Sequence, residues 1–289
     1  MAAPLALLAG VVLALAGLNR WPAETRRLQT WLLQGSVVAL GAGMDLRVLL
    51  RVGASGVGYT LAGLTATYAL ALGLRRLLRV EPVSALLIAT GTAICGGSAI
   101  AAAAPAIGAK SHQTSVALAV VFVLNGVALL VFPMLGHQLG LSESQFGLWC
   151  ALAIHDTSSV VGASMQYGGA ALALATTVKL ARALWILPVT AVLARVAPGE
   201  RASTKRSYPW FIAAFVAAAA LVTFVPGLEA PGRLVAAAAK WVLVASLFFV
   251  GLGVSKASLK EVGVRALLFG VVLWVLVAGG TLAAIVAVG

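Results

Sequence analysis

Long apolar stretches separated by short polar breaks run through the whole chain. A membrane-spanning helix needs about 20 predominantly apolar residues, and most of these stretches approach or exceed that length. The candidate at 29–44 is short, and we expect it to extend past Asp45. The pattern predicts an all-α, polytopic membrane helix bundle, with residues 1–289 forming a single transporter-like domain. Ten membrane elements are expected, at residues 2–18, 29–44, 55–73, 83–108, 112–135, 145–166, 170–195, 208–225, 235–253 and 264–287.

Composition supports a membrane protein and argues against a soluble fold. Of 289 residues, 62% are hydrophobic and 10% are charged, whereas soluble domains are about 45–50% apolar and about 25% charged. The formal net charge of +12 would suggest nucleic acid binding in a soluble protein. Here the basic residues lie mostly between apolar runs, where they suit cytoplasmic loops. We therefore expect a multi-pass protein of the cell (inner or plasma) membrane and no nucleic-acid partner.

The basic residues also predict a topology. They cluster after the first, third, seventh and ninth elements, so one orientation places all of these clusters in the cytoplasm and both termini outside. If 83–108 and 145–166 are re-entrant hairpins, Lys110 moves inside and loop 136–144 moves outside. Because Lys and Arg prefer cytoplasmic loops, the position of Lys110 alone favours the hairpin arrangement. The clusters are Arg20, Arg26 and Arg27; Arg75, Arg76 and Arg79; Arg195, Arg201, Lys205 and Arg206; and Lys256, Lys260 and Arg265.

A weak internal repeat accompanies this topology. Gly41, Gly43, Val52 and Gly53 match Gly251, Gly253, Val262 and Gly263 at a constant offset of 210. Inverted repeats with discontinuous helices are typical of secondary transporters. The alternative is coincidence in a chain with 31 glycines.

The segment 91–98 is the first of three that could carry chemistry. Its sequence, GTAICGGS, places three glycines and two hydroxyls within an apolar element. Non-helical backbone at membrane depth is tolerated only inside protein or beside a water-filled cavity. We expect a break here, with Gly96, Gly97 and Ser98 holding an anion at the N-terminus of the following half-helix. The alternative is a packing face of small residues.

The second segment, at 153–163, places His155 and Asp156 inside an apolar element. Ionisable residues there usually face a bundle interior or a transport pathway. Thr157, Ser158 and Ser159 could begin a half-helix capped by Asp156. We expect the three hydroxyl residues to bind substrate, and Asp156 and His155 to couple an ion. Asp156 should be buried against a basic or hydroxyl group of another element; the alternative is a purely structural cap.

The third segment carries Lys179 and Arg182 on one helix face, near the middle of the element 170–195. Two cations at this depth need partners, which could be Asp156 and an anionic substrate. The alternatives are an internal charge network or side chains that reach the membrane surface. Asn125, within 112–135, is a further candidate for ion coupling, although such residues more often join helices.

Several enzyme signatures do not occur in the sequence. There is no phosphate-binding Gly-x-x-x-x-Gly-Lys loop, no His-Glu-x-x-His and no Gly-x-Ser-x-Gly. The two cysteines are too few for a disulfide framework or a four-cysteine zinc site. We therefore expect neither an enzyme nor a cofactor or metal site.

Together, three motifs resemble the YeiH-type family, which is catalogued as uncharacterised and labelled by inference as sulfate exporters. They are Gly91–Ala102, the run from Phe146–Trp149 to Ile154–Val161, and Lys179–Arg182, supported by Pro209–Phe211 and Gly251–Gly253. The resemblance implies kinship with cation:proton antiporters and bile-acid:sodium symporters, hence inverted repeats, discontinuous helices and elevator-like motion. Family members start with a further hydrophobic segment that does not precede Met1 here, which leaves the helix count and repeat symmetry open.

These observations predict a secondary transporter of a small anion, with sulfate or sulfonate export as the leading candidate. A proton or sodium gradient would drive it. The alternatives are a passive anion channel or pore and a non-transporting membrane sensor or scaffold. The expected partners are the anion, the coupling ion and the lipid bilayer, with a homodimer as a possible assembly.

Overall fold

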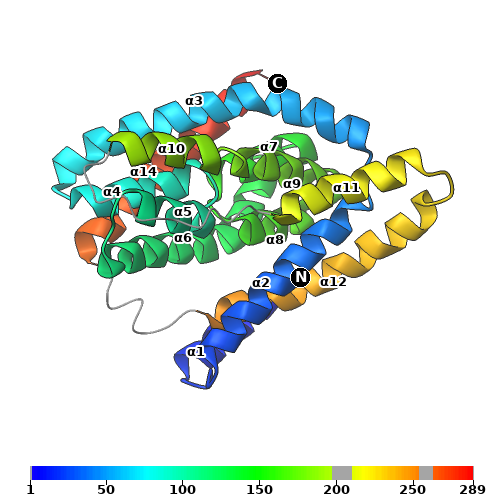
Figure 1. Ribbon diagram of the computed structural model, residues 1–289, viewed down its shortest axis with the longest axis horizontal. Coiled ribbons are helices and arrows are strands. Elements are labelled where there is room, and N and C mark those ends of the chain that lie inside the picture. The colour runs from blue at the N-terminus through cyan, green and yellow to red at the C-terminus, as the bar shows by residue number, and fades with distance from the viewer. Residues whose placement is uncertain (1, 197–209, 254–262, 289) are drawn as a thin grey trace. The chain divides into compact units, whose positions relative to one another are not determined.

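The computed structural model describes residues 2–196, 210–253 and 263–288, and the described part is helical without strands (Figure 1). By its internal contacts the chain divides into two compact units. The first comprises residues 1–54 and 208–255, and the second comprises 55–207 and 256–289. The expectation of one membrane domain over 1–289 stays a prediction.

Five helical stretches in the described part are long and apolar enough to cross a membrane. This agrees with the expected membrane protein, and several shorter helices lie in the other expected elements. The count of ten membrane elements stays a prediction. The five stretches are Val57–Leu78, His112–Gln138, Gly169–Arg195, Glu229–Phe249 and Val264–Val288.

The first unit is a bundle in which α12 packs against α1 and α2, and α11 packs on α2. Asn19 Nδ2, in the turn after α1, donates a hydrogen bond to the Leu252 carbonyl at the end of α12 (2.9 Å). The helices are α1 (Ala2–Leu15), α2 (Pro22–Gly41), α11 (Trp210–Phe224) and α12 (Glu229–Leu252), joined by the beginning of α3 (Leu46–Leu78).

Two glycines let the helices of this unit approach closely. A methyl group on Gly10 of α1 would collide with the Phe248 carbonyl oxygen of α12, and one on Gly41 of α2 would collide with the Phe215 carbonyl oxygen of α11. Without side chains at these positions, the backbones come into direct contact.

Gly10→Ala is therefore expected to destabilise the protein by about 1–3 kcal/mol, because the added methyl must push α1 away from α12. Gly35→Ala is the matched control, since Gly35 lies in α2 with open space around it. The control should be neutral or slightly stabilising, as alanine is favoured over glycine in helices by about 0.5–1 kcal/mol. Thermal melts in detergent would measure both, and equal melting temperatures would contradict the close packing.

The expected extension of 29–44 past Asp45 is wrong. The helix ends at Gly41 and instead begins earlier, at Pro22. Asp45 lies just before the next helix, and its Oδ1 accepts a hydrogen bond from the Arg47 N–H (2.7 Å) at the start of α3. Hydropathy could not locate the start of α2, because its first turn is polar.

The second unit contains the two elements expected to be interrupted. Residues 83–108 form α4 (Pro82–Ala93) and α5 (Gly97–Ala106), and residues 145–166 form α7 (Glu143–Ala153) and α8 (Thr157–Tyr167). Both interruptions, at 94–96 and 154–156, fall within the predicted segments. The remaining helices are α6 (Ser111–Gln138), α9 (Gly169–Ala183), α10 (Ile186–Val196), α14 (Val264–Val288) and the rest of α3.

Two glutamates tie together the ends of these interrupted elements. Glu81, just before α4, accepts a hydrogen bond from Gln113 Nε2 at the start of α6 (3.0 Å). Glu143, at the start of α7, accepts one from the Ala170 N–H at the start of α9 (2.7 Å). In both cases the residue at the start of the interrupted element therefore lies next to the helix that follows the element.

Glu81 also caps α4 through hydrogen bonds from the Val83 and Ser84 N–H groups. Burial raises the pKa of Glu81, but the hydrogen bonds from Ser84 and Val83 outweigh it, so the pKa lies below its ordinary value. A carboxyl with a lowered pKa stabilises the fold above that pKa, and this contribution is lost as the pH falls through it.

Some residues used in the sequence predictions lie outside the described part of the chain. They are Arg201, Lys205, Arg206, Pro209, Lys256, Lys260 and Val262.

Candidate functional site

The two helix breaks touch each other. A methyl group on Gly96 would lie 3.3 Å from the carbonyl carbon of His155 and 3.4 Å from Cα of Asp156. The Gly96 backbone has φ +67°, a conformation that favours glycine. The same methyl would lie 3.3 Å from Val121 Cγ1 of α6. Gly96 thus provides both the turn and the space that bring the breaks together beside α6.

The end of α7 exposes backbone carbonyls that cannot bond within the helix, and three buried side chains satisfy them. Lys179 Nζ donates to the Ile154 carbonyl (2.6 Å) and to Ala151 (3.4 Å). Trp274 Nε1 of α14 donates to the Ala153 carbonyl (3.1 Å). Cations at a helix C-terminus also favour the negative end of its dipole. The third side chain, Arg182, donates hydrogen bonds at both helix breaks.

Arg182 is 1% exposed and joins the ends of α4 and α7. On the α7 side, Nη1 donates to the carbonyls of Leu152 (2.5 Å) and Ala151 (3.3 Å). On the α4 side, Nε donates to Ala93 (2.6 Å) and Nη2 to Thr92 (3.2 Å). One guanidinium therefore caps two helices that are distant in sequence.

The opposite sides of the breaks are helix N-termini. The first N–H groups of α5 and α8 have no partner within their own helices. Asp156 is the N-cap residue of α8, and its carboxylate accepts a hydrogen bond from the Ser158 hydroxyl. The N-cap of α5 is Gly96, which has no side chain to offer, and Ser98 in the first turn is exposed. The N-terminus of α5 is thus the more open of the two.

Unpartnered polar atoms lie beside these termini. His155 is 0% exposed, and neither ring nitrogen has a hydrogen-bond partner among the described residues. Asn125 of α6 accepts a hydrogen bond from the Asp156 N–H through Oδ1 (3.2 Å), while its Nδ2 lacks a partner in the same part of the chain. Buried polar atoms usually have partners, and those that do not often mark functional sites.

The structure brings most of the predicted site residues to one place. Gly96, His155, Asp156 and Asn125 meet at the breaks, and Thr157, Ser158 and Ser159 form the buried first turn of α8. Asp156 is only half-buried, and its hydroxyl partner is Ser158 of the same segment rather than a group of another element.

Lys179 and Arg182 reach the breaks from the carbonyl side. Their acceptors are backbone carbonyls, neither Asp156 nor an open space. This contact set matches the internal-network alternative, and direct anion contact by these residues stays a prediction.

Sequence reasoning missed the contributions of Trp274, Glu81 and Glu143. Trp274 carries the signal of an indole N–H within an apolar span, which needs a partner when it is buried. Glu81 sits immediately before a short apolar helix, a position where an acidic side chain can accept hydrogen bonds from free N–H groups. Glu143 carries no such signal, because it binds the start of α9 and not of its own helix.

Comparison with known proteins places the chain in a family. The family described as Conserved hypothetical protein 698 matches residues 1–270. A UPF0324 membrane protein of Bdellovibrio bacteriovorus is 52% identical over 97% of this chain and 87% of its own length. A UPF0324 membrane protein of Geobacter sulfurreducens is 47% identical over 97% of this chain and 89% of its own. No solved structure matches. The chain therefore belongs to the UPF0324 family of membrane proteins, in agreement with the YeiH-type resemblance of its motifs.

Proposed function

We propose that this protein is a secondary transporter of a small anion, driven by a proton or sodium gradient across the cell membrane. The observation that carries the proposal is the meeting of two helix N-termini, those of α5 and α8, beside a half-buried carboxylate and unpartnered polar atoms. Helix N-termini are natural anion sites, because their N–H groups and dipoles point at the ligand.

The two interrupted elements are best explained as re-entrant hairpins. The Glu81–Gln113 and Glu143–Ala170 hydrogen bonds support this arrangement, because a spanning element would separate its two ends by the membrane thickness. With 12 residues in α4 and 11 in α7, the tips lie about 16–18 Å from the ends. That depth is about half of a 30 Å hydrocarbon core.

The hairpins enter from opposite sides of the membrane in this proposal. Helix α6 has 28 residues and is about 42 Å long, enough to cross the bilayer. It begins beside the first hairpin at Gln113 and ends before the second, which starts at Glu143. The segments α4–α5–α6 and α7–α8–α9 then form inverted repeats, as expected for secondary transporters. Lys110 lies on the cytoplasmic side together with Arg75 and Arg76.

In the site itself, the two N-termini have different tasks. The N-terminus of α8 already faces the Asp156 carboxylate, whereas that of α5, at Gly97 and Ser98, is open to an anion. An ionised Asp156 would repel an anion bound there, since like charges at close range disfavour each other. Protonation of Asp156, or a sodium ion bound to it, removes the repulsion and couples anion binding to the gradient. His155 and Asn125 Nδ2 supply further polar contacts.

Lys179 and Arg182 contribute positive charge to this site. Their bonds to the ends of α4 and α7 fix the charges close to the breaks. The charge lowers the cost of holding an anion in a low-dielectric region without a direct contact. Sulfate and small sulfonates are the leading substrates, because a tetrahedral oxyanion can accept hydrogen bonds from several N–H groups at once.

Uptake into proteoliposomes tests the proposal. Labelled sulfate and a small sulfonate are offered under imposed proton and sodium gradients, and we expect saturable uptake that follows one gradient. Ser98→Asp should reduce uptake at least ten-fold by placing a negative charge at the N-terminus of α5, while the neutral, similarly sized Ser98→Asn should retain it. Unsaturable flux that ignores both gradients would indicate a pore. No flux of any tested anion would favour the sensor or scaffold.

A further inference from the structure

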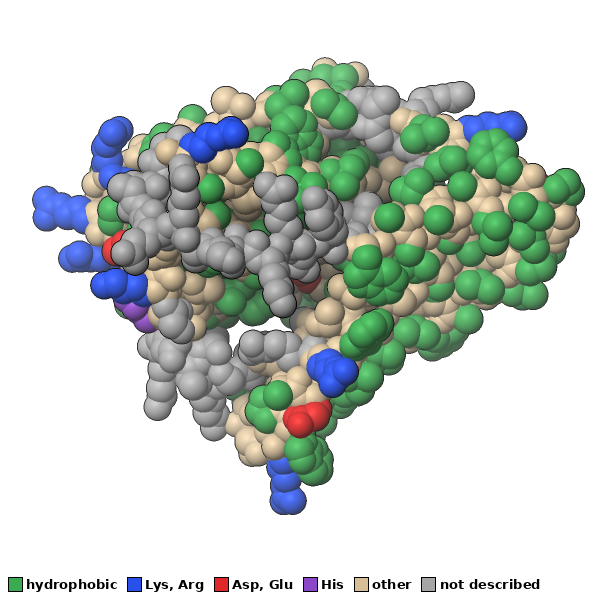
Figure 2. Space-filling view, viewed as in Figure 1, with side chains coloured by type: hydrophobic (Ala, Val, Ile, Leu, Met, Phe, Trp, Pro, Cys, Tyr) green, Lys and Arg blue, Asp and Glu red, His purple; other side chains and the backbone are tan. Residues whose placement is uncertain are grey.

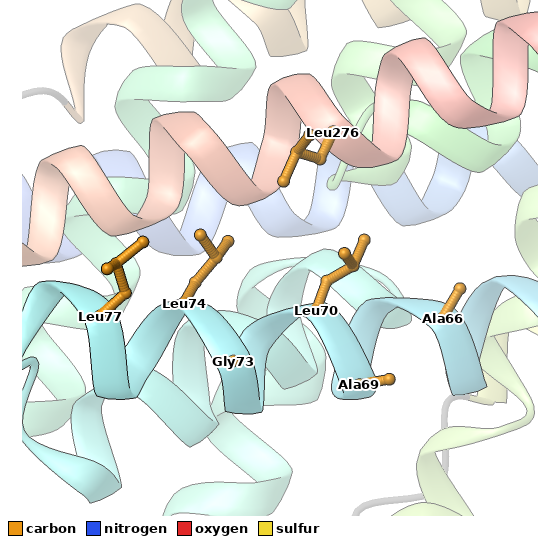
Figure 3. Close-up of a pocket in the computed structure, with 7 residues that line it drawn as sticks. All are labelled: Ala66, Ala69, Leu70, Gly73, Leu74, Leu77 and Leu276. Carbon is orange, nitrogen blue, oxygen red and sulfur yellow. The ribbon is translucent and has the colours of Figure 1, made fainter.

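An apolar groove lies between α3 and α14 of the second unit, away from the helix breaks. It has a volume of about 650 Å³ and is lined by Ala66, Ala69, Leu70, Gly73, Leu74 and Leu77 of α3 and Leu276 of α14. Figure 3 shows Leu70, Leu74 and Leu77 pointing from α3 toward Leu276. Small residues on α3 leave the space open, and a methyl group on Gly73 would meet no atom within 4 Å.

The position of the groove restricts its occupant. Both flanking helices are candidate membrane spans, Val57–Leu78 and Val264–Val288. Whatever fills the groove therefore lies at bilayer depth and must be apolar, like its lining. An apolar space beside two membrane spans fits a hydrocarbon chain.

One end of the groove is strongly basic. Helix α3 ends and α14 begins on this side of the second unit (Figure 1), so Arg76 near the end of α3 and Arg265 near the start of α14 lie toward this end, and both side chains are exposed. Arg265 lies eleven residues before Leu276, which is about three turns and about 16 Å along the same face of α14. Figure 2 shows Lys and Arg side chains gathered at the end of the second unit where Figure 1 places the end of α3 and the beginning of α14.

The neighbouring charges strengthen this basic character. Arg79 and Lys110 are both exposed. They lie near each other at this end, because Glu81 and Gln113, which follow them closely in the chain, are hydrogen-bonded to each other. Among the described residues near this end, Glu81 is acidic, and its carboxylate accepts hydrogen bonds from Val83, Ser84 and Gln113. In the part of the chain that the structure describes, no carboxylate is paired with Arg76 or Arg265, so both can contact an external anion.

We infer that the groove binds an anionic phospholipid, with one acyl chain along α3 and the phosphate on Arg76 and Arg265. The apolar lining accounts for the chain, and the charge at its mouth accounts for the headgroup, as basic residues beside spans recognise anionic lipids. A second copy of this chain packed against the groove would not require the basic residues at its end. The inference is independent of the proposed transport, because none of the groove residues lies at the breaks.

Native mass spectrometry of the purified full-length protein tests the site, with phosphatidylglycerol and phosphatidylcholine of identical chains as probes. We expect phosphatidylglycerol to bind at least ten-fold more tightly. Gly73→Leu should fill the groove and remove this binding. Gly63→Leu, the same change on the same helix in open space outside the groove, should not. The double variant Arg76→Gln, Arg265→Gln should lose the preference for the anionic lipid while still binding phosphatidylcholine.

Three results would overturn the inference. Equal binding of the two lipids by the native protein, or equal retention of phosphatidylglycerol by Gly73→Leu and Gly63→Leu, would mean that lipid binds elsewhere or without headgroup selection. A loss of dimer in Gly73→Leu with unchanged lipid binding would identify the groove as an interface between copies of this chain.

Discussion

Replacing Arg182 with glutamine is expected to lower the stability of the protein by about 3–5 kcal/mol, because buried carbonyls at two helix ends lose a charged donor. The guanidinium donates to four carbonyls at the ends of α4 and α7. Glutamine is shorter, carries no charge and has two N–H donors in place of five. Carbonyls left without donors in a buried position each add a desolvation penalty of about 1–3 kcal/mol if they stay unpaired. Thermal melting in detergent measures the change.

Arg195→Gln is the matched control, because Arg195 lies on α10, is exposed and undergoes the same change of charge. Its melting temperature should stay close to that of the native protein. Arg182→Lys should fall between the two, since one ammonium cannot reach both helix ends. If Arg182→Gln melts normally and instead loses anion affinity, then Arg182 is a substrate ligand and its role as a cap is wrong.

Replacing Asp156 with asparagine is expected to leave the protein folded and to abolish the dependence of anion uptake on the proton gradient. Asparagine is also a good N-cap, and its amide oxygen can accept the hydrogen bond from Ser158. It also imitates the protonated carboxyl, because it is neutral, so the anion should still bind and exchange. Uptake under an imposed pH gradient should fall at least ten-fold, whereas exchange of labelled for unlabelled anion should persist.

Ser158→Ala serves as the control for the local structure. It removes the hydroxyl that contacts Asp156 but keeps the titratable group, so uptake should still depend on the gradient even where loss of this hydroxyl lowers the affinity for the anion. If Asp156→Asn transports with the same gradient dependence as the native protein, then Asp156 takes no part in coupling and acts only as a cap. If sodium rather than a proton is the coupling ion, the sodium dependence is the one that disappears.

The ends of α4 and α7 fall in segments whose composition acts on a helix locally. Glycines and hydroxyls at 91–98, and the run from His155 to Ser159, weaken a helix wherever they occur, and the breaks fall at 94–96 and 154–156. The start of α2 at Pro22 was missed for the opposite reason. A polar first turn lowers the hydropathy of a segment without preventing it from being helical, so hydropathy reports burial in lipid rather than helix ends.

The partners of Lys179 and Arg182 could not be predicted in this way. The sequence shows two cations in an apolar element, where an unpaired charge is energetically unfavourable, and it therefore predicts that both need partners. The partners are backbone carbonyls, however, which every residue carries and which no sequence pattern distinguishes. Arg182 finds Thr92 and Ala93 about 90 positions away, and only the fold reveals which helix ends face it. The expected pairing of either cation with Asp156 is not among the hydrogen bonds of the structure, and contact with a substrate stays a prediction.

The guanidinium that caps both α4 and α7 also limits how the site can change its access. Separating the tip of α4 from the tip of α7 would break hydrogen bonds of Arg182. Buried carbonyls would then lack donors, and the buried guanidinium would lack acceptors. The two tips consequently form a single stiff piece, and small local gates at either tip are disfavoured. If the proposed transport is correct, exchange of access between the two membrane faces requires displacement of this piece as a whole, so spin labels placed on α4 and α7 should keep a constant separation while their depth in the bilayer changes.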